Sequence, residues 1–232
     1  MKDSSLNRWL WLIGLVAIAL IGVSFGPLSS GSPGENASGL SVANWYNSHV
    51  NQQWAVLWMV GVALFLLLVF ATQLRTVLVN SGGQRLWPNI VFASAILLVA
   101  GTIVSGSFAI TLILASHNHQ YAIAHFINFY MTNDYLLLLA GIDFLTFSAG
   151  LAILLNREVA PLPKLLGWYS ILVAVVGVAG PLSFFAFLFG FPIWVLATGI
   201  VIAVKQSRGT LGGGPAAGAA VSVAAPAEPV AV

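Results

Sequence analysis

The chain has 232 residues, of which 59% are hydrophobic and only 6% are charged. Soluble domains carry about 25% charged residues, so this composition excludes a water-soluble domain and indicates an integral membrane protein. The absence of cysteine excludes disulfides, thiolate catalysis and cysteine-ligated metals. Eight Lys and Arg against six Asp and Glu are too few for a nucleic-acid interface, so the expected partner is the lipid bilayer.

The apolar runs of the sequence predict the number of membrane crossings. A helix needs about 20 mainly apolar residues to cross the hydrocarbon core. The last apolar run, residues 165–204, is too long for one crossing. Gly180 with Pro181, and Gly190 with Phe191 and Pro192, bracket a predicted turn that divides it. The pattern predicts an all-α bundle of six transmembrane helices at residues 9–26, 54–72, 90–115, 135–155, 165–181 and 188–204.

The positive charges predict the orientation of this bundle. With six crossings, every Lys and Arg falls on one side of the membrane: Lys2, Arg8, Arg75, Arg85, Arg157, Lys164, Lys205 and Arg208. Cytoplasmic loops are the ones enriched in Lys and Arg, so both termini are expected in the cytoplasm. The expected location is the plasma (inner) membrane. Residues 1–208 form one transmembrane domain in this scheme, and residues 209–232 form a disordered cytoplasmic tail rich in Gly, Ala, Pro and Val.

The first apolar run can be interpreted in a second way, as a signal peptide rather than a transmembrane helix. A basic start followed by an apolar stretch over residues 1–26 is also typical of a cleaved signal peptide. The run is long for a signal sequence and lacks an A-x-A-like exit, so we expect it to be retained as a helix. Cleavage would leave five helices with the same orientation.

The two larger outer loops are expected to contain short interfacial helices. Between Ser41 and Val50, apolar and aromatic residues recur at helical spacing. In the second loop, Tyr121, His125 and Phe129 recur every four residues. Amphipathic rings prefer the headgroup level of a bilayer, which favours helices lying at the interface.

Small residues in the third and fourth spans are expected to allow close helix packing. They are Gly101, Ser105, Gly106, Gly141, Ala149 and Gly150.

This layout resembles a group of small bacterial six-helix membrane proteins of the domain-of-unknown-function type. The resemblance covers residues 37–205 and rests on three stretches. They comprise Ala37, Ser38, Gly39, Trp45, Tyr46 and His49; Asn133, Asp134 and Tyr135; and residues 163–169, Gly180, Pro181, residues 184–187 and Trp194. It implies a membrane location and a six-helix bundle, and it implies no reaction, because the group has none assigned.

The histidines are candidate metal or haem ligands. All four, His49, His117, His119 and His125, lie in the two outer loops. Three convergent imidazoles, from His117, His119 and His125, would suffice for a metal site. Histidine is also an ordinary interfacial residue with a polar tip, and it titrates near neutral pH. We favour the interfacial role and expect no metal and no cofactor.

Asp143 is the only ionisable side chain inside an expected span. A charge at that depth costs about 2.5–3.5 kcal/mol or more, so the side chain is expected to face protein and to be protonated. No Lys or Arg lies within a span to pair with it, which leaves hydroxyls as hydrogen-bond partners. The candidates are Thr146 on its own helix, Thr102, Ser105 and Ser107 on the third span, and Tyr169, Ser170 and Ser183 beyond.

Three functions remain open at this point. Sparse polar groups and short inner loops favour a non-enzymatic accessory or interaction protein that contacts other membrane proteins. A small transporter or channel-like protein would use Asp143 and the hydroxyls of the third span as a relay. A metal- or haem-binding protein would use the outer histidines. The sequence contains no familiar nucleotide, zinc-protease or serine-hydrolase motif, and it identifies neither a catalytic residue nor a small-molecule substrate.

Overall fold

A computed structural model describes residues 4–80, 85–133, 136–155, 162–179 and 182–208. Every regular element in these ranges is helical, which confirms the all-α class. The elements are α1 (Ser4–Phe25), η1 (Pro27–Ser29), α2 (Gly39–Ser48), α3 (Val50–Asn80), α4 (Leu86–His117), α5 (Tyr121–Asn133), α6 (Leu136–Leu155), α7 (Lys164–Val178), α8 (Ser183–Phe185), the π-helical η3 (Ala186–Gly190) and α9 (Phe191–Ser207). The predicted tail, residues 209–232, lies outside the described residues.

Within the described residues, four stretches of helix are long and apolar enough to cross a membrane: Trp9–Ser29, Val50–Asn80, Leu86–His117 and Ala186–Lys205. Two further apolar helices, Leu139–Leu155 and Lys164–Val178, are shorter. Apolar helices of this length indicate a membrane protein, because a helix satisfies its own backbone hydrogen bonds within lipid.

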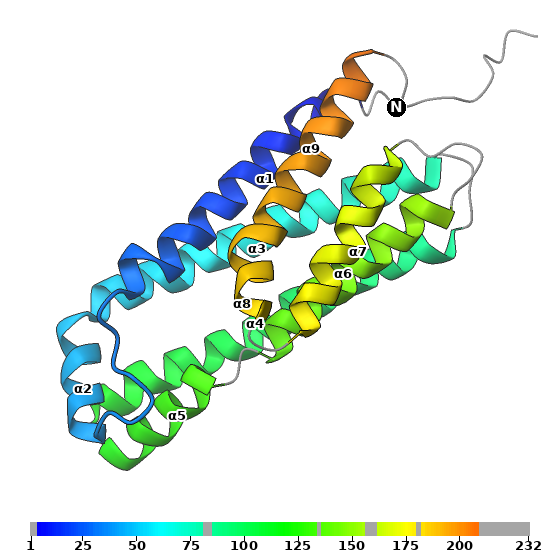
Figure 1. The fold of residues 1–232 in the computed structure, drawn as a ribbon. Coiled ribbons are helices and arrows are strands. Elements are labelled where there is room, and N and C mark those ends of the chain that lie inside the picture. The colour runs from blue at the N-terminus through cyan, green and yellow to red at the C-terminus, as the bar shows by residue number, and fades with distance from the viewer. Residues whose placement is uncertain (1–3, 81–84, 134–135, 156–161, 180–181, 209–232) are drawn as a thin grey trace, which may run out of the picture.

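The long helices pack side by side (Figure 1). Helix α1 packs against α3 and α9, and α6 packs against α4 and α7. Helices α3 and α4 contain 31 and 32 residues. At 1.5 Å per residue they are about 46 and 48 Å long, well beyond the roughly 30 Å hydrocarbon thickness. Their projecting ends meet α2 and α5, so one end of the bundle is enlarged into what we call the cap: α2, α5 and the adjoining end of α4.

The centre of the bundle is a single apolar core drawn from α1, α3, α4, α6, α7 and α9. Trp194 is fully buried there, and the ring of Phe70 lies edge-on to it with centroids 6.2 Å apart. The Trp194 Nε1 donates to Ser170 Oγ over 2.6 Å, which joins α9 to α7. A second apolar cluster, centred on Val42, Leu112 and Ile127, holds the cap together.

Glycines allow two of the closest helix contacts. A Cβ atom at Gly150 would lie 2.9 Å from the Gly167 carbonyl oxygen, and one at Gly141 would lie 2.7 Å from Leu98 Cα. These two glycines do what the small-residue pattern predicts. Gly106 does not, because a Cβ atom there would have only Leu57 Cδ2 within 4 Å, at 3.9 Å.

The predicted turn before the last span is partly wrong. Gly180 and Pro181 lie outside the described residues, but the chain is helical from Ser183 onward. In η3 the Phe191 N–H bonds to the Ala186 carbonyl, five residues back. A proline ring clashes with the carbonyl four residues before it in an α-helix, and the wider π turn ahead of Pro192 relieves that clash without breaking the chain's helical path.

The glycine contact between α6 and α7 gives a stability test. We expect Gly150→Val to lower the free energy of unfolding by about 1–3 kcal/mol, because the new side chain meets the Gly167 carbonyl and Ile171. Gly61→Val is the matched control, since a Cβ atom at Gly61 meets nothing within 4 Å. Thermal unfolding in detergent measures both variants. Equal losses in the two variants would contradict the close packing of α6 on α7.

Candidate functional site

Asp143 lies on α6 with its carboxyl group pressed against Gly177 of α7. A Cβ atom at Gly177 would overlap the Asp143 carboxyl group, so only glycine leaves room for it. The Oδ1 atom is buried and has no hydrogen-bond partner among the described residues. The site is therefore a narrow notch between two helices, and the side chain that faces the acid is a hydrogen atom.

The hydroxyls expected to bond to Asp143 bond elsewhere. Each donates to a carbonyl of its own helix: Thr102 to Leu98 (2.8 Å), Ser105 to Gly101 (3.2 Å), Ser107 to Val104 (2.6 Å) and Thr146 to Ile142 (2.9 Å). Serine and threonine in helices commonly bond to the preceding turn, which satisfies the hydroxyl locally in a medium without water. The expected hydrogen bonds from these four hydroxyls to the acid are not formed.

The hydroxyls on α7 also have other acceptors. Tyr169 donates to the Gly190 carbonyl over 3.1 Å, and Ser170 donates to the Leu166 carbonyl over 2.7 Å. The wide π turn ends at Gly190, and its carbonyl is thus available to a side chain of the neighbouring helix. The Tyr169 bond joins α7 to η3, and the Ser170 bond stays within α7. Asp143 is left without a hydroxyl partner in the described parts of the chain.

The four histidines have separate surroundings in and beside the cap. His125 Nδ1 lies 2.8 Å from the Ala37 carbonyl, which ties α5 to the segment before α2. His49 Nδ1 lies 2.8 Å from the Trp45 carbonyl, and its ring stacks on the Trp45 ring at 4.6 Å. A carbonyl oxygen only accepts, so a hydrogen bond at either contact requires the tautomer with its proton on Nδ1.

The other two histidines lie at the end of α4 and just beyond it. His119 has a positive φ of 57° and its Nδ1 lies 3.2 Å from the Tyr121 hydroxyl, and His117 is exposed in the last turn of α4. Within the described residues, no three His, Asp or Glu side chains are grouped closely enough to hold a metal ion. The convergence of His117, His119 and His125 that a metal site would need is not seen in this part of the chain.

Gly177 is the functional neighbour that sequence reasoning missed. It lies in a long run of apolar residues in which any glycine is unremarkable. Its helical position relative to the acid depends on how α7 is rotated against α6, which no local pattern encodes. The only feature of the sequence that pointed to an unusual neighbour was the scarcity of hydrogen-bond partners for Asp143.

The contact between Asp143 and Gly177 predicts a specific coupling. Gly177→Ala should lower the free energy of unfolding by about 1–3 kcal/mol, because its methyl group overlaps the carboxyl. In an Asp143→Ala background the same change should cost much less, with a coupling of about 0.5–3 kcal/mol. Thermal unfolding of the four proteins measures the cycle. Gly167→Ala is the control, since its close neighbours are Ile153 and Leu154, and it should add to Asp143→Ala without coupling.

Comparison of the chain with protein-family models, with curated proteins and with solved structures finds no match. These comparisons therefore do not bear on the resemblance to small bacterial six-helix membrane proteins, which stays a prediction from the residue pattern.

Proposed function

We propose that the chain is a six-span protein of the plasma membrane with both termini in the cytoplasm. We further propose that it is a non-enzymatic accessory or interaction protein. The observation that carries the second proposal is the isolation of Asp143. Its carboxyl is packed against Gly177, and the hydroxyls expected to bond to it, such as those of Thr102 and Thr146, bond to backbone carbonyls. In the described residues, no chain of hydrogen bonds leads from this acid to either end of the bundle.

The six-span scheme is supported by the packing of the two shorter helices. Helix α6 has 20 residues, about 30 Å, and lies between α4 and α7. Helix α7 has 15 residues, about 22 Å, and it lies alongside α6 in the same bundle (Figure 1). Their packing beside the long apolar helices supports a crossing by each of these two shorter helices.

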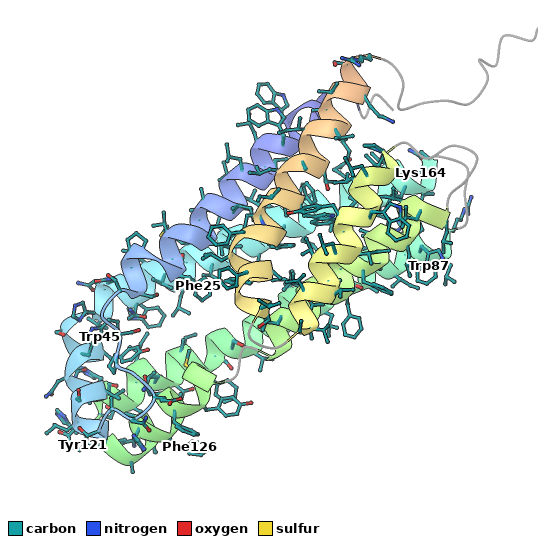
Figure 2. The ribbon with its side chains drawn as sticks, in the orientation of Figure 1. Phe25, Trp45, Trp87, Tyr121, Phe126 and Lys164 are labelled. Carbon is teal, nitrogen blue, oxygen red and sulfur yellow. The ribbon has the colours of Figure 1, made fainter. Side chains whose placement is uncertain are left out.

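The orientation is supported by the position of the basic residues in the bundle. The start of α1, the end of α3, the start of α4, the start of α7 and the end of α9 all lie at the end opposite the cap (Figure 1). Figure 2 shows Lys164 and Trp87 there, and Trp45, Tyr121 and Phe126 at the cap. Concentration of Lys and Arg at one end is the positive-inside pattern, which assigns that end to the cytoplasm.

Reporter fusions test this topology. A reporter placed after Arg208 or near Gly82 should be cytoplasmic, and one placed at Asn36 or Asn118 should be external, because the basic loops stay inside. Enzymatic reporters that are active on only one side of the membrane make the measurement. An external reporter at Gly82 would overturn the six-span scheme and the charge argument together.

A proton or cation transporter is the second candidate, and the unpaired Asp143 Oδ1 is the observation that favours it. A relay needs a carboxyl that loses and regains a proton, and an amide of nearly equal volume cannot do this. For an accessory protein, wild-type proteoliposomes should leak protons no faster than empty vesicles, and Asp143→Asn should behave identically. Proton flux in the wild type that is lost in a stable Asp143→Asn protein would overturn the accessory role.

The accessory role also predicts a partner. Mild-detergent extracts of native membranes should yield a second membrane protein in constant proportion with the wild type and with Asp143→Asn alike. Recovery of the chain alone from such extracts would count against an interaction protein.

A further inference from the structure

A cavity of about 460 Å³ lies where the cap joins the bundle. Its walls come from the end of α1, the segment that follows, and α2, α3, α4 and α5. Figure 2 shows two of its lining residues, Phe25 beside α1 and Trp45 at the cap. Binding pockets for small molecules have volumes of about 300–1,000 Å³, so this space is large enough to hold a ligand.

The cavity exists because its wall on α4 carries small side chains. Ser105 and Gly106 line it, and an ideal Cβ atom at Gly106 would meet only Leu57 Cδ2 within 4 Å, at 3.9 Å. A glycine in a transmembrane helix commonly permits a close contact between two helices. Gly106 makes no such contact, so the space that its missing side chain leaves belongs to the cavity.

The segment between α1 and α2, residues 26–38, forms another wall, and we call it the strap. Three strap residues line the cavity: Ser29, Ser32 and Pro33. Two side chains fasten the strap, since Gln52 Nε2 donates to the Leu28 carbonyl and Asn128 Nδ2 donates to the Gly34 carbonyl over 3.1 Å. The strap is thus a wall that runs from the end of α1 to the cap and is held by α3 and α5.

Part of the cavity lies within the hydrocarbon layer. From Trp9 to Phe25 along α1, and from Trp87 to Val104 along α4, the rise of 1.5 Å per residue gives about 24 and 26 Å. Tryptophan is enriched at the membrane boundary, which places Trp9 and Trp87 at the inner edge of a layer about 30 Å thick. Phe25 and Val104 then lie inside its outer edge. This placement rests on the proposed topology.

The cavity reaches the surface of the bundle at this depth. Three of its lining residues are also exposed: Phe25 of α1, Val104 of α4 and Tyr130 of α5. Helix α1 packs against α3 and α9, whereas α5 packs against α4 and α2, so α1 and α5 have different neighbours. The cavity therefore opens between α1 and the pair formed by α4 and α5. An opening at the depth of Phe25 and Val104 faces lipid.

The walls hold neither an ion nor a cluster of water well. Among the described residues that line the cavity, none is Lys, Arg, Asp, Glu or His. The side chains of Thr102, Ser105 and Asn128 already donate to backbone carbonyls. An ion taken out of water needs a counter-charge, and a buried water needs about three polar partners.

An apolar occupant is favoured instead. Val56, Leu57 and Val60 of α3 form an apolar wall, and a pocket of about 20 Å³ that shares Phe25, Val60 and Thr102 continues the space. Apolar cavities of about 150 Å³ stay dry and bind molecules such as benzene, and this cavity has about three times that volume. Left empty, the walls would lose the van der Waals contacts that an occupant supplies. The apolar molecule found at the opening is the hydrocarbon chain of a lipid.

We propose that a hydrocarbon chain of an outer-leaflet lipid enters this cavity sideways, between α1 and α5, and occupies it. The chain lies against Val56 and Val60, and the rest of the lipid stays at the membrane boundary beside the strap. Because none of the described wall residues is charged, the site selects an apolar chain and does not select a headgroup. The choice of leaflet rests on the proposed topology.

Photo-crosslinking in lipid nanodiscs tests the occupant. The probe is phosphatidylcholine with a diazirine in the middle of one acyl chain, and the labelled residues of the full chain are mapped by mass spectrometry. Val56 and Val60 on the cavity wall should be labelled, and so should Phe65, which is exposed on the same helix. Labelling of Phe65 without labelling of Val56 and Val60 would overturn the proposal.

A filling variant tests whether the chain reaches this wall through the cavity. Gly106→Phe places a ring in the empty space, so the label at Val56 and Val60 should be lost while the label at Phe65 remains. Gly61→Phe is the matched control and should keep the wall labelled, because a Cβ atom there meets nothing within 4 Å and the residue is exposed.

Thermal unfolding establishes that these variants fold. Gly106→Leu fills less of the space and replaces Gly106→Phe if the larger ring prevents folding. Retained labelling of Val56 and Val60 in a folded filling variant would overturn the proposal, as would equal loss in Gly61→Phe.

Thiol accessibility tests the cavity for water. The chain contains no cysteine, so Ser105→Cys introduces a single thiol on the wall. Thiols react as thiolates, which form in water, so a chain-filled cavity should leave this thiol unmodified by a water-soluble methanethiosulfonate. Asn118→Cys, exposed at the end of α4, is the control and should react fully. Equally rapid modification of the two would show a water-filled cavity and overturn the proposal.

These outcomes are separate from those of the proposed function. Labelling in nanodiscs does not depend on which side of the membrane the cap occupies. A reporter that places Asn36 in the cytoplasm would overturn the choice of leaflet alone. Loss of the label at Val56 and Val60 would leave the reporter topology and the flux result intact.

Discussion

Inside lipid, a polar group has only the protein itself as a hydrogen-bond partner, and that constraint governs this structure. The hydroxyls of Thr102 and Thr146 turn back to their own helices, and the Trp194 indole reaches Ser170 across the core. Against that background, the few buried groups left unpaired become informative. Among the described residues, Asp143 Oδ1 and Gln53 Nε2 are two of them.

Protein atoms enclose both of these exceptions. The Asp143 carboxyl fills its notch so closely that Gly177 has no room for a methyl group. The Gln53 Nε2 atom is buried as well, so a bound molecule could not reach it without a shift of the side chain. We therefore infer that both groups belong to the packing of the protein.

Much of the fold followed from the sequence because apolar length and helical spacing are local properties. The all-α class and both short helices beside the outer loops, now α2 and α5, were predicted this way. The continuous π-helical path into Pro192 was not, because it depends on packing around a clash. The candidate site was predicted in part. Asp143 stood out as a lone acid, but its partner depended on the rotation of α7. Gln53 lay just outside the predicted span and drew no notice.

The π turn at Ala186–Gly190 also sets the phase of the last helix. An α-helix turns about 100° per residue, and a five-residue hydrogen bond inserts one residue without adding a turn. The faces of the helix before and after η3 are thereby offset by about 100°. Phe187, within η3, lies with its ring centroid 6.1 Å from that of Phe25, whereas the Trp194 indole, after η3, donates to Ser170. Residues within and after the π turn thus contact neighbours that lie in different directions.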